Sequence, residues 1–384
     1  MDDWQAGGFG LYLHWPFCEA KCPYCDFNSH VALAIDQGSW TSAYLAELGR
    51  VAEETGDRVL NSVFFGGGTP SLMTPESVAS FLTEIRRLWP IANDLEVTLE
   101  ANPSSVEAGR FTGFRDAGVN RVSVGVQAFD DDGLRRLGRL HSVAEARQAL
   151  EIANACFDRV SFDLIYARQD QSLTDWGAEL ADALTLSTGH LSLYQLTIEP
   201  GTAFGARHAR GGLAGLPDDD LSADMYALTQ DLCGAAGLPA YEISNHAAEF
   251  AQSRHNLIYW RGGDYAGIGP GAHGRLTLQG QRYATRMFEM PDAWMNAVST
   301  EGSGERPREV LSDKEHAEEY LMMSLRLSEG SDMARYASLR GRALDQARIG
   351  GLVELGLVEQ RTNRLVATEQ GRLVLNGILR ELLA

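Results

Sequence analysis

Short apolar runs alternate with longer amphipathic stretches over the first two thirds of the chain. The apolar runs predict β-strands at residues 10–14, 62–65, 95–100, 121–126, 159–165 and 190–196. Apolar residues at helical spacing between them predict helices that include 41–53, 75–88 and 143–155. Such alternation predicts an α/β protein with a parallel sheet. Six units suggest a partial (β/α)6 barrel of the TIM type, and the pattern alone also allows a doubly wound sheet.

The pattern changes after residue 278. Residues 279–311 mix aromatic residues, glycines and charges, which we interpret as a connector. Further on, the sequence predicts helices at 314–327 and 344–355, a hairpin at 357–368 and a final helix that ends at residue 383. Ser312 precedes Glu315 by three residues, which is typical of a helix N-cap. We therefore expect a barrel at residues 1–278 and a small winged-helix-like domain at 312–384.

Composition restricts the function classes. The 384 residues carry a formal net charge of −19, which argues against nonspecific nucleic-acid binding and against an anionic membrane surface. Residues 312–384 hold 11 acidic and 10 basic side chains, a net charge of −1, so the winged-helix-like domain shows no electrostatic footprint for DNA. The sequence has no stretch of membrane-spanning length and no signal-peptide pattern, so we expect a cytoplasmic protein whose thiols stay reduced.

Three cysteines follow the first predicted strand with the spacing C-x3-C-x2-C. They are Cys18, Cys22 and Cys25. Three thiolates on one loop suit a cubane 4Fe-4S cluster, and because such a cluster normally takes four ligands, one iron is left open for a chelating molecule. A zinc site completed by His14 or His30 is the alternative. A disulfide is less expected, since three clustered thiols leave one over.

Polar residues stand where several predicted strands end, which is the ligand-binding edge of such a sheet. They are the glycines 66–68 with Thr69, then Glu100, Gln127, Asp163 and, shortly after the fourth strand, Arg139. Capping or solvation explains each one equally well by itself. As a set they favour a ligand, because carboxylates and an amide bind hydroxyl and ammonium groups and an arginine fork binds a carboxylate.

The stretch LYLHWPFCEAKCPYC resembles the cluster loop of the radical S-adenosylmethionine (SAM) superfamily. The resemblance implies that SAM chelates the open iron through its amino and carboxylate groups and is cleaved when the reduced cluster donates an electron. It also favours the partial barrel over the doubly wound sheet. Residue by residue, it implies SAM contacts at Tyr12, Tyr24, Gly67, Gly68, Thr69, Glu100, Gln127, Arg139 and Asp163.

Further motifs resemble the oxygen-independent coproporphyrinogen III oxidase-like family over most of the chain. They are GGGTPSLM, RVSVGVQAF, YEISNHA and GIGPGAHGR. In that family the dehydrogenase has a fourth cysteine two residues after the third, where this chain has Phe27, and a long N-terminal extension that this sequence lacks. The HNxxYW signature at residues 255–260 is typical of the haem chaperone branch, HemW. The resemblance thus implies haem binding and transfer to an acceptor protein, expected in respiration, without net porphyrin chemistry.

Within HNxxYW, His255 is a candidate haem contact, since imidazole ligates haem iron and aromatic residues offer flat apolar area. Structural packing explains the same residues, and other histidines compete: His14, His141, His246 and His273. Two enzyme alternatives stay open. One is oxidative decarboxylation of coproporphyrinogen III, with Arg139, Arg254 or Arg261 holding the anionic substrate, and the other is a haem-modifying methyltransferase. The resemblance also allows a homodimer.

Overall fold

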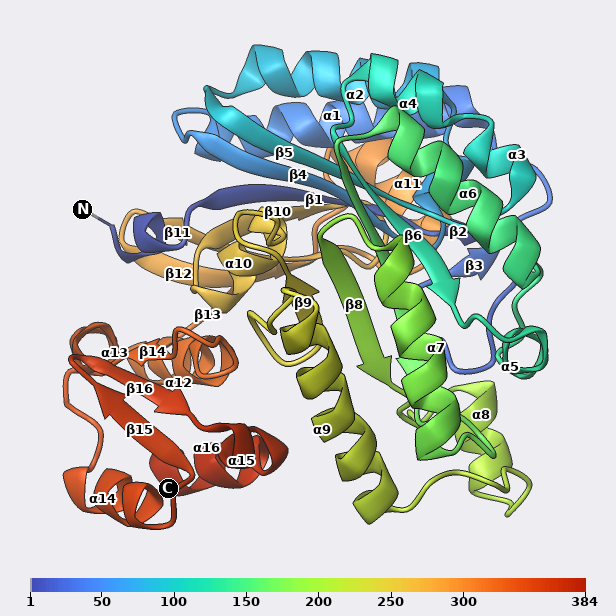
Figure 1. Cartoon of the computed structure of the whole chain (residues 1–384). Helices are drawn as coiled ribbons and strands as arrows, with labels where there is room; N and C mark the ends of the chain where they lie inside the picture. The colour runs from blue at the N-terminus through green and yellow to red at the C-terminus, as the bar shows by residue number, and fades with distance from the viewer. Residues whose placement is uncertain (1) are drawn as a thin grey trace.

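The computed structural model describes residues 2–384, except for the side chains of residues 105 and 106. Its main feature is an 11-stranded sheet in the order β13-β12-β11-β10-β1-β4-β5-β6-β7-β8-β9, shown in Figure 1. Six neighbouring strands in the middle of this order are parallel: β1 (Phe9–Trp15), β4 (Leu60–Gly67), β5 (Ile91–Ala101), β6 (Arg121–Gln127), β7 (Arg159–Tyr166) and β8 (His190–Gln195). They coincide with the six predicted strands, so the expected parallel α/β sheet is confirmed.

The strand order separates the two topologies that the pattern left open. From β1 to β8 the parallel strands follow one another in chain order. A doubly wound sheet reverses its direction part-way, whereas a barrel adds each strand to the same side. The order therefore matches an incomplete barrel, and its strands are buried along almost their whole length, as parallel strands covered on both faces must be.

Helices cover the outer face of the parallel strands (Figure 1). They are α1 (Gln37–Thr55), α2 (Pro75–Leu88), α4 (Phe111–Ala117), α6 (Val143–Cys156), α7 (Leu173–Leu186) and α9 (Asp219–Ala235). The short helices α3 (Ser105–Ala108), α5 (Asp131–Arg136) and α8 (Ala203–His208) lie toward the carboxyl ends of the strands. Local sequence sets their starts: Ser142 and Ser172 each form a reciprocal capping box at the beginning of α6 and α7. Short 3-10 helices span Asp3–Ala6 and Pro70–Leu72.

Both edges of the sheet extend beyond the six parallel strands. On one side β10 (Asp264–Ile268) runs parallel to β1, and β11 (His273–Leu278), β12 (Gln281–Arg286) and β13 (Glu309–Val310) follow antiparallel. On the other side the short strand β9 (Asn245–Ala247) pairs antiparallel with β8. Helix α10 (Arg254–Trp260) connects these two edges along the chain.

The segment 279–311 differs from the expected connector. It forms β12, the helix α11 (Pro291–Glu301) and β13, and so belongs to the main sheet and its core. Trp294 of α11 is fully buried and stacks on Trp40 of α1, with ring centroids 5.7 Å apart. Gly280 and Gly302 lie at turns, whereas Arg282 is buried and pairs with Asp264. The helical apolar pattern at 294, 297 and 298 is short and does not stand out among these glycines and charges.

The C-terminal part has a core of its own. It consists of α12 (Asp313–Ser324), β14 (Ser331–Asp332), α13 (Met333–Arg340), α14 (Gln346–Glu354), β15 (Val358–Arg361), β16 (Arg364–Ala367), α15 (Glu369–Leu373) and α16 (Leu375–Leu383). Leu321, Ile349, Leu365 and Ile378 pack together in a cluster separate from the main core. The capping box at Ser312 is present at the start of α12, and the predicted helices and hairpin are present. Within residues 2–384, no helix is both long enough and apolar enough to cross a membrane.

Candidate functional site

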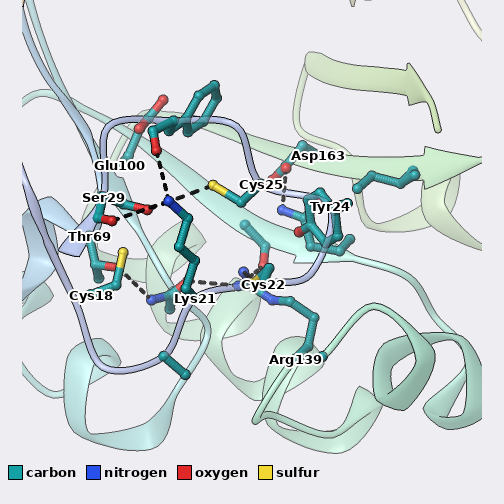
Figure 2. A pocket seen from close by; sticks show the side chains of 18 of the residues that line it. Cys18, Lys21, Cys22, Tyr24, Cys25, Ser29, Thr69, Glu100, Arg139 and Asp163 are labelled. Atoms are coloured by element: carbon teal, nitrogen blue, oxygen red, sulfur yellow. Dashed lines mark hydrogen bonds between the residues drawn. The ribbon is translucent and has the colours of Figure 1, made fainter. Parts of the chain in front are cut away.

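A cavity of about 660 Å³ lies at the carboxyl ends of the parallel strands. Side chains from the ends of β4, β5, β6, β7 and β8 line it together with the cysteine loop. Of the residues that the sequence singled out, these line it: Cys18, Cys22, Tyr24, Cys25, Gly67, Gly68, Thr69, Glu100, Gln127, Arg139 and Asp163. The fold therefore brings together groups that stand far apart in the sequence, as Figure 2 shows.

The cysteine loop is closed by two short parallel strands, β2 (Phe17–Cys18) and β3 (His30–Val31). Within it the Cys25 N–H donates to the Cys22 carbonyl oxygen at 3.1 Å. The Thr69 hydroxyl donates to the Cys18 Sγ at 3.4 Å, and the Cys25 Sγ lies 3.9 Å from the Ser29 hydroxyl oxygen. All three thiols are free of disulfide bonds, so all are available as ligands.

The donor set fits a cluster better than a single ion. In the part of the chain that the structure describes, no three His, Cys, Asp or Glu side chains converge closely enough to hold one metal ion. A cubane binds each thiolate at a different iron and accepts a wider separation of the sulfur atoms. Burial raises the pKa of the Cys18 and Cys25 thiols, and a bound metal reverses that effect because it stabilises the thiolate.

The glycine-rich turn after β4 packs against the strand that leads into the cysteine loop. The Gly68 N–H donates to the Trp15 carbonyl oxygen at 2.7 Å, and the Thr69 N–H donates to the Phe17 carbonyl oxygen at 2.8 Å. A Cβ at position 68 would lie 2.7 Å from that same Phe17 oxygen. Gly67 has a φ of +110°, a conformation that favours glycine. Close backbone contact therefore requires glycine at position 68, and the backbone conformation favours glycine at position 67.

Two carboxyl groups in the cavity have a raised pKa. Burial, with the nearby Asp163 adding to it, raises the pKa of Glu100 to about 8. Burial likewise raises the pKa of Asp163 to about 6, although Arg139 opposes the shift. The Gln127 amide donates to Asp163 from a backbone with a φ of +71°, which a side-chain-bearing residue rarely adopts. Strain and perturbed pKa values of this kind concentrate at functional sites.

Arg139 places a guanidinium group beside the cysteines. Its Nη1 donates to the Cys22 Sγ at 3.5 Å, and its Nη2 donates to the Asn102 Oδ1 at 2.7 Å and the Gly125 carbonyl oxygen at 2.9 Å. Its Nε is buried and has no hydrogen-bond partner among the described residues. An arginine guanidinium in the wall of a cavity suits a ligand carboxylate.

Several residues that line the cavity were not predicted from the sequence. They include Asn102, Glu107, Ser123 and Tyr194, whereas His141, which the sequence named only as a competing histidine, also lines the cavity. A signal existed for Asn102, because it stands two residues after Glu100, at the end of the same strand, and side chains two apart point to one face. Glu107 comes from the short helix α3, where strand periodicity gives no indication.

The structure does not bring Tyr12 and His255 to this cavity. The Tyr12 hydroxyl lies 3.0 Å from the His14 Nδ1 within β1. His255 is 1% exposed, and burial lowers its pKa to about 3. Its Nδ1 lies 2.7 Å from the Ser62 hydroxyl and its Nε2 lies 2.5 Å from the Tyr259 hydroxyl. Both ring nitrogens thus have partners in the interior, and Tyr259 of the HNxxYW signature is one of them.

The chain matches two known protein-family models and several known proteins. The model of the Radical SAM superfamily matches residues 12–176, and that of the HemN C-terminal domain matches residues 311–374. The Heme chaperone HemW of Escherichia coli is 38% identical over 380 residues, which cover 97% of this chain and 98% of that protein. This chain belongs to the HemW family of radical SAM proteins. Members of the superfamily use a 4Fe-4S cluster, which the cysteine spacing predicted, and SAM, which the resemblance implied.

A mitochondrial protein and a solved structure also match this chain. The mitochondrial Radical S-adenosyl methionine domain-containing protein 1 of Bos taurus is 42% identical over 325 residues, which cover 83% of this chain and 73% of that protein. The structure of coproporphyrinogen III oxidase (HemN) from Escherichia coli matches with a TM-score of 0.81 and 20% identity, covering 98% of this chain and 92% of that chain. At that identity the match shows the fold, and it confirms the radical SAM barrel with its small C-terminal domain.

Proposed function

We propose that this protein is a haem chaperone, which binds haem and transfers it to an acceptor protein. The observation that carries the proposal is the match over nearly the whole chain to proteins named Heme chaperone HemW in Escherichia coli and Haemophilus influenzae, at 38% and 37% identity. The exposed Phe27, which occupies the place of the dehydrogenase's fourth cysteine, supports the same branch. We propose further that the protein acts in the cytoplasm on an acceptor of respiration.

The proposal assigns the cavity to the cluster and SAM. Cys18, Cys22 and Cys25 hold the iron, and SAM lies against Tyr24, Gly67, Gly68, Thr69, Glu100, Gln127, Arg139 and Asp163. When bound, the reduced cluster supplies an electron to SAM. The protein's own groups bind and orient: Arg139 offers its guanidinium to a carboxylate, and the strand-end carboxyl groups hydrogen-bond hydroxyl groups.

Product analysis tests the haem chaperone proposal against the enzyme alternatives. Anaerobically reconstituted protein with SAM and a reductant receives coproporphyrinogen III in one reaction and haem in another. We expect stoichiometric haem binding, an unmodified haem and an unchanged coproporphyrinogen III. Protoporphyrinogen IX would show a dehydrogenase, and a methylated or opened haem would show a haem-modifying enzyme; either product would overturn the proposal.

A further inference from the structure

We infer that Asn102 is a positioning residue that holds the hydrogen-bond donors to two of the three proposed cluster cysteines. The inference rests on the cluster assignment proposed above. Asn102 follows β5 directly and lines the cavity without contacting a cysteine itself. Its side-chain amide lies between Thr69, which donates to Cys18, and Arg139, which donates to Cys22.

The contacts form one continuous chain from sulfur to sulfur. The Thr69 hydroxyl donates to the Cys18 Sγ at 3.4 Å and accepts from the Asn102 Nδ2 at 3.2 Å. On the other side the Asn102 Oδ1 accepts from the Arg139 Nη2 at 2.7 Å, and the Arg139 Nη1 donates to the Cys22 Sγ at 3.5 Å. Asn102 is therefore the shared partner of both donors.

The chemistry of the partners determines which way the amide points. An arginine side chain can only donate, so the atom of Asn102 that faces Arg139 must be the oxygen. The amide nitrogen then faces Thr69, and it is also 3.5 Å from a carboxylate oxygen of Glu107. Glu107 further accepts the Asn102 backbone N–H at 3.0 Å and is itself 1% exposed. This buried carboxyl group holds both the backbone and the side chain of Asn102 in place.

Hydrogen bonds to cluster sulfur atoms stabilise the more negative, reduced state and so raise the reduction potential. Thr69 lies after β4 and Arg139 lies after α5, so the two donors reach the cysteine loop from separate elements. Without the Asn102 amide, the Thr69 hydroxyl loses its donor, and the Arg139 Nη2 keeps only the Gly125 carbonyl oxygen as a partner. We therefore expect Asn102 to affect the cluster's potential and the orientation of Arg139 toward the carboxylate of SAM.

The test compares Asn102→Ala with the wild type and with Asn154→Ala, in which the same change is made at an exposed site on α6. Iron and sulfide content, the midpoint potential of the cluster and the dissociation constant of SAM are measured after anaerobic reconstitution. We expect Asn102→Ala to shift the potential to more negative values and to weaken SAM binding about tenfold. Asn154→Ala should match the wild type in all three measurements.

A double-mutant cycle separates positioning from simple structural support. Thr69→Val removes the hydroxyl that donates to Cys18 and accepts from Asn102, and keeps a side chain of similar size. If Asn102 acts through Thr69, adding Thr69→Val to Asn102→Ala shifts the potential by less than it does in the wild type. Fully additive shifts would overturn the inference.

Two further results would overturn the inference about Asn102. A full cluster with an unchanged potential in Asn102→Ala overturns the inference and leaves the haem chaperone proposal intact. A wild type that takes up no cluster overturns the cluster assignment and the inference with it. If Asn102→Ala does not fold, Asn102→Ser, which keeps a small polar side chain, is measured in the same way.

Discussion

At the scale of single residues, Glu100 shows how the cavity disfavours ionisation of its own groups. Burial and Asp163 raise its pKa to about 8, so the folded chain keeps a proton that the unfolded chain releases above about pH 4.5. Stability from this group is therefore present below about pH 4.5 and is lost as the pH rises toward 8. We expect Glu100→Gln, which does not titrate, to be more stable than the wild type by about 2–4 kcal/mol at pH 8.

Urea unfolding of the cluster-free protein at pH 4.5 and pH 8 tests this expectation. The difference between Glu100→Gln and the wild type should be small at pH 4.5 and large at pH 8, because both side chains are neutral at the lower pH. An equal difference at the two pH values would show that the carboxyl group of Glu100 is not held protonated by its surroundings.

His255 illustrates a residue whose place is structural in this fold. Its ring is buried between Ser62 and Tyr259, with no free nitrogen. We expect His255→Ala to lower the free energy of unfolding by about 2–4 kcal/mol, since it leaves a cavity and two unpaired hydroxyl groups. The absorption spectrum of bound haem should stay the same. His208→Ala, at an exposed site on α8, is the control; a changed haem spectrum in His255→Ala alone would make His255 a haem ligand after all.

At the scale of elements, the site depends on the contact between the glycine-rich turn and the strand before the cysteines. An alanine at position 68 would push its Cβ into the backbone of Phe17. We expect Gly68→Ala to cost about 1–3 kcal/mol of stability and to reduce the iron bound per chain, because it displaces the start of the cysteine loop. Chemical unfolding and iron analysis measure both effects.

Gly49→Ala provides the matched control. Gly49 lies inside α1, where an added Cβ meets no described atom within 4 Å. Alanine favours the helix, so this change should raise stability by about 0.5–1 kcal/mol and leave the iron content unchanged. If the two variants behaved alike, close contact at position 68 would not be the reason for its glycine.

Helices and strands whose apolar residues recur at a regular spacing were predictable from the sequence, and those without such a spacing were not. All six parallel strands and helix α2 follow from apolar runs and helical spacing. Residues 279–311 were misread because strand β12 and helix α11 carry too few apolar positions to stand out among glycines and charges. The cavity-lining residues at strand ends were likewise predictable, whereas Glu107 reaches the site from the short helix α3, whose direction only tertiary packing determines.

At the scale of the whole molecule, Arg335 joins the C-terminal part to the barrel. Its guanidinium contacts both Asp3 carboxylate oxygens, at 2.7 and 2.6 Å, and the Arg261 carbonyl oxygen at 2.5 Å, and it lies 4.5 Å from the centre of the Tyr320 ring. We expect Arg335→Ala to lower stability by about 2–4 kcal/mol and to make cleavage between the two parts by a protease faster.

An exposed ion pair provides the comparison for Arg335. Arg361 and Glu359 pair on the surface of the β15–β16 hairpin, where both side chains are more than half exposed. Arg361→Ala should therefore change stability by less than about 0.5 kcal/mol and leave the protease pattern unaltered. Equal effects of the two variants would contradict a joining role for Arg335.

A haem chaperone must transfer its haem to an acceptor protein, and labelled haem allows this transfer to be followed. Protein loaded with iron-55 haem is mixed with an extract of haem-starved cells, and the proteins are then separated under native conditions; free labelled haem is run alongside. We expect the label to leave the protein and to appear in one or a few discrete acceptors that free haem does not select. Label that stays on the protein, or spreads over the same proteins as free haem, would contradict the haem chaperone proposal.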